Sequence, residues 1–93
     1  MEPSTLKRLE QVRELSRQRL DVAPEFVLFQ SIYAQLDFMC RLATGQESDR
    51  SRLQRVNIGR YAVREFEESD PEFARALKDA QYIADRMAKG LKV

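Results

Sequence analysis

Apolar residues recur at helical spacing through most of the chain, and the longest such stretch covers residues 24–43. At about 100° per residue, this stretch places on one broad face Leu28, Phe29, Ile32, Tyr33, Leu36, Met39, Cys40 and Ala43. A second, narrower apolar strip on the far side consists of Val27, Ala34, Phe38 and Leu42. A helix that is apolar on two sides has to be covered on two sides. We therefore expect the 24–43 helix to lie at the centre of a small helical bundle.

The segment before this stretch predicts a first covering helix. Apolar residues recur from Pro3 to about Leu20 at mostly helical spacing, among basic residues. Residues 21–23 form a short connection, and Pro24 suits the first turn of the central helix, where its missing amide hydrogen costs nothing. We expect the first two helices to form an antiparallel hairpin.

The chain after the central helix predicts two shorter helices. Gly45 suits the left-handed conformation that ends many helices. After a polar loop, Ser48 or Asp49 can cap a short helix. A break at Asn57 then precedes an amphipathic covering helix over residues 58–69.

The last helix has the clearest start and the most regular pattern. Asp70 can cap it, and Pro71 fits its first position. It runs to about Lys89, where Gly90 serves as the C-cap before a short tail. Its apolar stripe consists of Phe73, Ala76, Leu77, Ala80, Ile83, Ala84 and Met87. Tyr82 lies opposite the centre of that stripe.

The length fits one all-α domain. The 93 residues are enough for one modest core, so we predict a single domain over residues 1–93. Its fold class is a bundle of about four to five helices. The longest apolar run, Phe26 to Phe29, is far too short to span a bilayer, and the amino terminus has no apolar signal core. We expect a cytoplasmic protein with no membrane partner.

The composition excludes several kinds of chemistry. The sequence has no histidine, so the usual general base, zinc ligand and activator of a nucleophile are missing. Its single cysteine, Cys40, lies on an apolar face and excludes a disulfide framework. The net charge of +1 supplies no general attraction to nucleic acid or to a membrane. We predict no enzyme activity and no cofactor.

The densest charged cluster is acidic and has no base among residues 65–72; it consists of Glu65, Glu67, Glu68, Asp70 and Glu72. Carboxylates hold a metal or act as an acid and base pair only where they converge in a pocket, whereas these fan outward. Asp70 and Glu72 have an ordinary role at the positive start of the last helix. We predict no metal site and no catalytic residue here, and a solvated or partner-facing Glu67 and Glu68.

Two tyrosines and a run of arginines complete the candidate features. Tyr61 and Tyr82 lie away from the apolar stripes, where a ring either anchors an interface or packs at the edge of the core. Edge packing is the favoured interpretation for Tyr61. The arginines of residues 50–64 lie among short helices, as in a helix-turn-helix. A recognition helix that begins with carboxylates would repel phosphates, so we expect no nucleic-acid partner.

The carboxy-terminal half contains the sequence GRYAVREFEESDPEFARALKDAQYIADRMAKGLK. This stretch, within residues 49–92, resembles a small all-helical family of bacterial immunity proteins. The shared features are Gly59, Ala62-Val63, Glu65-Phe66, Asp70-Pro71-Glu72, Arg75-Ala76-Leu77-Lys78-Asp79-Ala80, Tyr82 and Gly90-Leu91-Lys92. An ordered set of this length is far more specific than a short motif. The amino-terminal half matches only in helical character, length and the proline before the central helix.

Members of that family protect cells against toxin domains delivered by type VI secretion. The best-known target is an NAD(P)+ glycohydrolase, and relatives are paired with different nucleotide-targeting toxins. The resemblance implies a cytoplasmic protein that binds a cognate toxin domain and covers its nucleotide cleft. Because a cleft that holds phosphates is often basic, an acidic helical face is complementary to it. We predict that the partner-binding residues are Tyr61, Arg64, Glu67, Glu68, Asp70 and Tyr82.

Two alternatives stay open. A helical adaptor or structural subunit would act through self-association, as a homodimer that uses the strip of Val27, Ala34, Phe38 and Leu42. A small enzyme would need a pocket that works without histidine.

Overall fold

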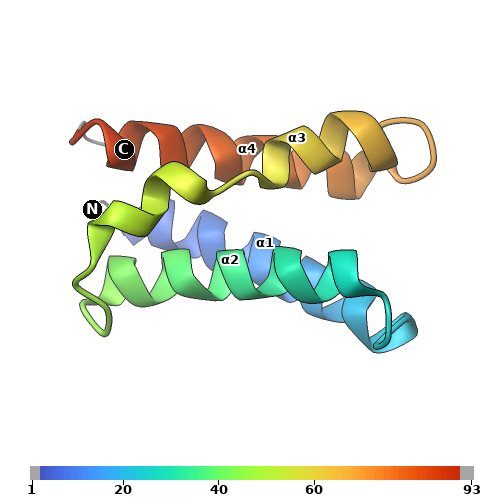
Figure 1. Cartoon of the computed structure of the whole chain (residues 1–93), viewed down its shortest axis with the longest axis horizontal. Coiled ribbons are helices and arrows are strands. Elements are labelled where there is room, and N and C mark those ends of the chain that lie inside the picture. The colour runs from blue at the N-terminus through green and yellow to red at the C-terminus, as the bar shows by residue number, and fades with distance from the viewer. Residues whose placement is uncertain (1–2, 91–93) are drawn as a thin grey trace.

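The computed structural model describes residues 3–90 and has an all-α fold, with no β-strand in that part of the chain (Figure 1). Its elements are the α-helices α1 (Pro3–Val22) and α2 (Val27–Thr44), the 3-10 helix η1 (Arg50–Arg55), the short α-helix α3 (Ile58–Tyr61), the π-helical turn η2 (Ala62–Phe66) and the α-helix α4 (Pro71–Ala88). The predicted small all-α bundle is confirmed. The tail that the sequence places after Gly90 lies outside the described residues.

The helices form two layers (Figure 1). Helices α1 and α2 make an antiparallel hairpin in one layer, as predicted. The chain then crosses through η1 to the other layer, where α3 and η2 lie beside α4. Helix α4 packs against α1, η1, α3 and η2, whereas α2 packs mainly against α1. The element with the most neighbours is therefore α4 and not α2, for which the central position was predicted.

The core lies between the two layers and draws apolar side chains from every element. Its fully buried members include Leu9, Ile32, Leu36, Met39, Leu53, Ile58, Phe73, Leu77 and Ile83. The ring of Phe66 lies 5.8 Å from that of Phe29 and 5.1 Å from that of Phe73, between centroids. Cys40 is also buried, and burial raises the pKa of its thiol, which fits the inert role expected of it.

The predicted central helix over residues 24–43 begins too early. Helix α2 begins at Val27, because Phe26 has an extended backbone with ψ of 108°. The turn before it is held by the side-chain amide of Gln30, which donates to the carbonyl of Pro24 at 2.8 Å. The proline therefore belongs to the connection and not to the first helical turn.

The second apolar strip of α2 is covered over half its length. Phe38 and Leu42 are buried, and the guanidinium of Arg52 lies 4.7 Å from the ring centre of Phe38. Val27 and Ala34 are exposed. The strip is therefore not the continuous open face that the homodimer prediction requires.

The helix predicted over residues 58–69 is divided at Tyr61. The buried residues Ile58, Ala62 and Phe66 are spaced four apart. In an α-helix, residues four apart point in directions that differ by about 40° around the axis, so each successive one lies farther from the core face. A wider π turn offsets this rotation and keeps Phe66 on the core face. The division thus follows from the core position of this ring.

The predicted helix ends at Asp70, Asp49, Gly45 and Gly90 are confirmed. The Asp70 carboxylate accepts a hydrogen bond from a backbone amide in the first turn of α4, and Pro71 occupies the first helical position. Asp49 caps η1 in the same way. Gly45 and Gly90 have φ of 83° and 73°, the left-handed conformation in which glycine ends a helix.

Candidate functional site

The structure brings three of the predicted partner-binding residues together on η2 and the turn after it. Arg64, Glu67 and Glu68 are exposed and line a hollow of about 420 Å³. We call this the η2 hollow; its residues are Val63, Arg64, Glu65, Glu67, Glu68 and Ser69. Val63 adds an exposed apolar side chain to it. The hollow therefore combines both signs of charge with one apolar contact.

An ion pair joins the η2 hollow to α4. The ammonium of Lys78 lies 2.6 Å from the carboxylate of Glu67, and both side chains are about half exposed. A pair this exposed contributes little to stability. It does hold one carboxylate of the hollow toward the outer face of α4, where Tyr82 lies one turn beyond Lys78.

Tyr82 lies on the outer face of α4, opposite the core, as its angular position predicts. Its side chain is 55% exposed. The guanidinium of Arg86 lies 5.6 Å from the centre of its ring. An exposed ring of this kind is available as an interface anchor.

Tyr61 packs against the core and not outward. It is half-buried among the residues that border the hydrophobic cluster. The prediction of edge packing for this ring is confirmed, and its exposure is lower than that of Tyr82.

Asp70 is engaged within the chain. Its carboxylate accepts hydrogen bonds from the Arg19 guanidinium at 2.7 Å and 3.3 Å, and from the amide of Phe73 at 3.4 Å. Hydrogen bonds from Arg19 hold the pKa of this carboxyl below its usual range. Glu72 accepts from the same guanidinium at 3.1 Å. Asp70 thus fixes the start of α4 against the end of α1.

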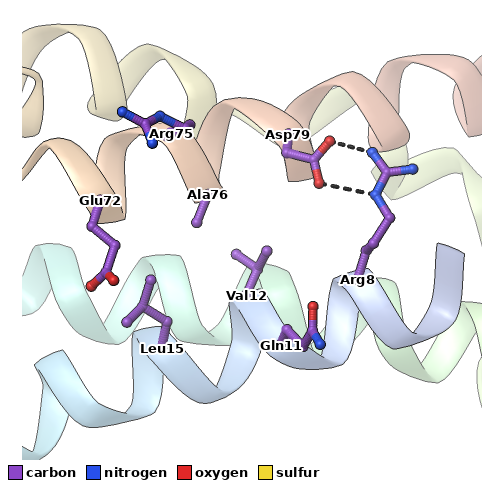
Figure 2. A pocket seen from close by; sticks show the side chains of 8 residues that line it. All are labelled: Arg8, Gln11, Val12, Leu15, Glu72, Arg75, Ala76 and Asp79. Carbon is purple, nitrogen blue, oxygen red and sulfur yellow. Dashed lines mark hydrogen bonds and ion pairs between the residues drawn. The ribbon is translucent and has the colours of Figure 1, made fainter. Parts of the chain in front are cut away.

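The structure also contains a groove between α1 and α4 that the sequence interpretation missed. This α1–α4 groove has a volume of about 480 Å³ and is lined by Arg8, Gln11, Val12, Leu15, Glu72, Arg75, Ala76 and Asp79 (Figure 2). The helical stripe of α4 did place Ala76 toward a neighbouring helix. The pairing of α4 with α1 depends on tertiary structure, so no local signal gives the groove.

Residues 3–90 contain neither a cluster of metal ligands nor a helix suited to a membrane. No group of three or more His, Cys, Asp or Glu side chains there is placed to hold a metal ion. None of the helices in that range is both long enough and apolar enough to cross a membrane.

These observations define a small all-α domain whose distinguishing features lie on its surface: a charged hollow, an exposed ring and a groove. Comparison with known families makes the identification specific. The chain belongs to the Tsi6 family, because the model of the family described as Tsi6 matches residues 5–86. The predicted resemblance to bacterial immunity proteins is confirmed and extends through α1 and α2.

Individual relatives agree with this assignment. The chain is 43% identical over 75 residues to "Immune protein Tsi6" of Pseudomonas aeruginosa strain PAO1, an alignment that covers 81% of this chain and 80% of the relative. It superposes with a TM-score of 0.88 on a chain of the solved structure of Tse6 in complex with Tsi6, at 36% identity, covering 95% of this chain and 94% of that one. The solved structure of Tsi6 from Pseudomonas aeruginosa gives a TM-score of 0.80, also at 36% identity, with 90% and 95% covered.

Proposed function

We propose that this protein is an immunity protein that binds the toxin domain of a cognate effector and occludes its active site. The observation that carries the proposal is the match, over 95% of the chain, to a chain of the solved structure of Tse6 in complex with Tsi6. The shared fold provides a compatible scaffold, and inhibition by occlusion requires no chemistry from this chain.

We further propose that the toxin acts on nucleotides as an NAD(P)+ glycohydrolase, is delivered by type VI secretion, and is bound in the cytoplasm of the producing cell. The resemblance of residues 59–92 to the immunity family supports this finer assignment. Blocking a cleft is sufficient for protection, because a substrate that cannot enter cannot react.

The docking face that we propose consists of the outer face of α4 together with the η2 hollow. Tyr82 would be the anchoring ring, while Arg64, Glu67 and Glu68 set orientation and encounter rate against a basic, phosphate-binding cleft. Their exposure, and the ion pair that joins Glu67 to α4, support this assignment. Tyr61 and Asp70 would act indirectly, by supporting the face.

The experiment has two stages. Tagged protein captures its effector from lysate of the source organism, and the effector's toxin domain is then produced separately. Co-expression of this domain in a susceptible bacterium, with and without the present protein, is followed by viability and by the cellular NAD+ and NADP+ content. Survival with preserved nucleotides supports the proposal. Survival that is no better than without the protein contradicts it.

Two charge-reversal variants test the docking face. We expect Glu67→Lys combined with Glu68→Lys to weaken toxin binding by about tenfold or more without loss of helicity. The control combines Glu10→Lys with Glu25→Lys, two exposed carboxylates far from η2 in the sequence, and makes the same change in net charge. If both double variants bind equally to the toxin domain, the docking face lies elsewhere.

A second candidate function is a self-associating adaptor, favoured by one observation. Three of the exposed large apolar side chains, Val22, Phe26 and Val27, lie at the corner between α1 and α2. Exposed apolar side chains that gather in this way are typical of protein contacts. Light scattering distinguishes the two functions, because the adaptor has to be a stable oligomer in the absence of a toxin.

A further inference from the structure

The α1–α4 groove has an apolar floor between the two helices that form its sides. Val12, Leu15 and Ala76 point toward one another between the helices, with Val12 only 6% exposed (Figure 2). Because one wall contributes only a methyl group at Ala76, the helices leave a space there that their own side chains do not fill. The volume of about 480 Å³ lies within the range typical of binding pockets.

Ion pairs lie near both ends of the groove. Arg8 pairs with Asp79 toward one end. Toward the other end, the guanidinium of Arg19 hydrogen-bonds to Asp70 and Glu72. These pairs run between α1 and α4 on either side of the groove and leave its middle unfilled. The groove is already open in the chain without a partner, which lowers the cost of binding one in it.

Arg75 is the charged group on the groove that stands apart from these pairs. Its side chain is exposed, and among residues 3–90 it has no hydrogen bond or ion pair. Arg8, Asp79 and Glu72 are all paired within the chain. The planar guanidinium of Arg75 has free donors that can bind a carboxylate, and the apolar floor beside it can receive an apolar side chain. A partner segment that carries these two groups side by side therefore fits the groove.

The groove is continuous with the exposed ring of α4. Tyr82 lies one turn from Asp79 on the same helix, and more than half of its side chain is exposed. A partner that covers the ring from the α1 side therefore also reaches the groove.

We propose that the α1–α4 groove receives an apolar side chain of the toxin domain, and that a carboxylate beside that side chain pairs with Arg75. This inference rests on the proposed function and adds to it a second contact, on the opposite flank of α4 from the η2 hollow. The toxin segment that it requires is both acidic and apolar, whereas the η2 hollow calls for a basic one. The two contacts together fix the orientation in which the toxin docks.

The test measures affinity for the toxin domain identified by capture, using purified proteins and calorimetry. We expect Ala76→Phe, which fills the groove, and Arg75→Glu, which repels a carboxylate, each to weaken binding by about tenfold or more. The loss for Arg75→Glu should shrink at high salt. Lys89→Glu is the matched control, an exposed reversal at the other end of α4, and should change affinity less than about twofold.

The outcomes separate this inference from the proposed function. If the wild-type protein does not bind the toxin domain, the proposed function fails and this inference fails with it. If the wild type binds while folded Arg75→Glu and Ala76→Phe bind equally well, only the groove assignment is overturned. A wild-type dimer that Ala76→Phe dissociates, with toxin affinity unchanged, would assign the groove to a second copy and also overturn it. Should Ala76→Phe fail to fold, Arg75→Glu decides alone, because its side chain is exposed.

Discussion

Helix α4 is packed in two different ways along its two flanks. On the α3 side, the side chain of Gln81 accepts from the amide of Gly59 at 3.0 Å and donates to the carbonyl of Val56 at 3.0 Å. On the α1 side, ion pairs such as that between Arg8 and Asp79 join the two helices near the ends of their contact, and an open groove lies between these pairs. One helix thus has a closed flank and an open one.

The difference shows how a small domain can pair its polar backbone groups on one flank of a helix and leave the other flank open. On the closed flank, Gln81 forms hydrogen bonds with backbone groups at the connection between η1 and α3. Without it these groups would lie partly buried and unpaired. Gln35 of α2 makes a similar reciprocal pair with Asn57 at 2.8 Å and 2.9 Å. Two amide side chains, one from α2 and one from α4, therefore hold the connection between η1 and α3 in place. The open flank depends instead on ion pairs that are partly or largely exposed.

The largest effect is expected where the closed flank is tightest. A Cβ added at Gly59 would lie 2.8 Å from both the Cβ and the Cγ of Gln81, too close for any real contact. We expect Gly59→Val to lower the free energy of unfolding by about 2–3 kcal/mol, because overpacking forces the two helices apart. Denaturant unfolding followed by circular dichroism measures this change.

The control for this variant introduces the same residue at the next position. Arg60 is exposed in the same short helix, so Arg60→Val should change stability by no more than about 0.5 kcal/mol. Equal costs for the two variants would mean that the cost comes from valine in a short helix and not from close packing.

The next effect concerns the hydrogen bonds of the closed flank. Gln81→Met keeps the length of the side chain but leaves the amide of Gly59 and the carbonyl of Val56 without this partner. We expect a loss of about 1–2 kcal/mol in the same unfolding experiment. Gln11→Met, on the open flank, should cost less than about 0.5 kcal/mol because Gln11 is exposed. A larger loss of stability for Gln11→Met than for Gln81→Met would show that the open flank, and not the closed one, contributes more to the stability of the fold.

Local sequence signals predicted α4 better than they predicted its neighbours. The cap at Asp70, the proline at Pro71 and the regular apolar stripe are all contained within α4, so the sequence alone identifies them. The start of α2 depends instead on an extended Phe26, and the π turn depends on how Phe66 meets the core. Both of these follow from packing that a local pattern does not contain.

The same distinction applies to the surface. The exposure of Tyr82 follows from its angle on a single helix, and it was predictable. The pairing of Glu67 with Lys78, the pairing of Asp70 with Arg19, and the groove all join residues from different elements. Their geometry exists only after the helices have packed. The sequence therefore indicated Glu67 and Asp70 as candidates but neither of their partners, and it did not indicate the groove.

The third effect is a pH dependence at the end of the open flank. Hydrogen bonds from Arg19 lower the pKa of Asp70 in the folded state, so its carboxylate stabilises the fold above the ordinary pKa of about 4. This stabilisation is lost as the pH falls through the lowered pKa. We expect Asp70→Asn, which keeps a capping side chain, to cost about 1 kcal/mol near neutral pH and almost nothing in strong acid.

Unfolding curves of wild type and Asp70→Asn at several pH values test this prediction. Glu68→Gln serves as the control, since Glu68 is exposed and has no ion pair within residues 3–90. Its difference from wild type should stay near zero at every pH. A cost of Asp70→Asn that did not change with pH would mean that the ion pair with Arg19 contributes nothing.

The smallest effect is expected at the other end of the open flank. Arg8 and Asp79 form an ion pair between α1 and α4, but their side chains are 43% and 38% exposed. Water and salt screen such a pair, so a double-mutant cycle of Arg8→Gln and Asp79→Asn should give a coupling energy of about 0.2–1 kcal/mol that decreases with salt. A coupling above about 2 kcal/mol, independent of salt, would contradict the comparison between the flanks. The open flank would then be held as firmly as the closed one, and its groove would be a structural feature and not a free surface.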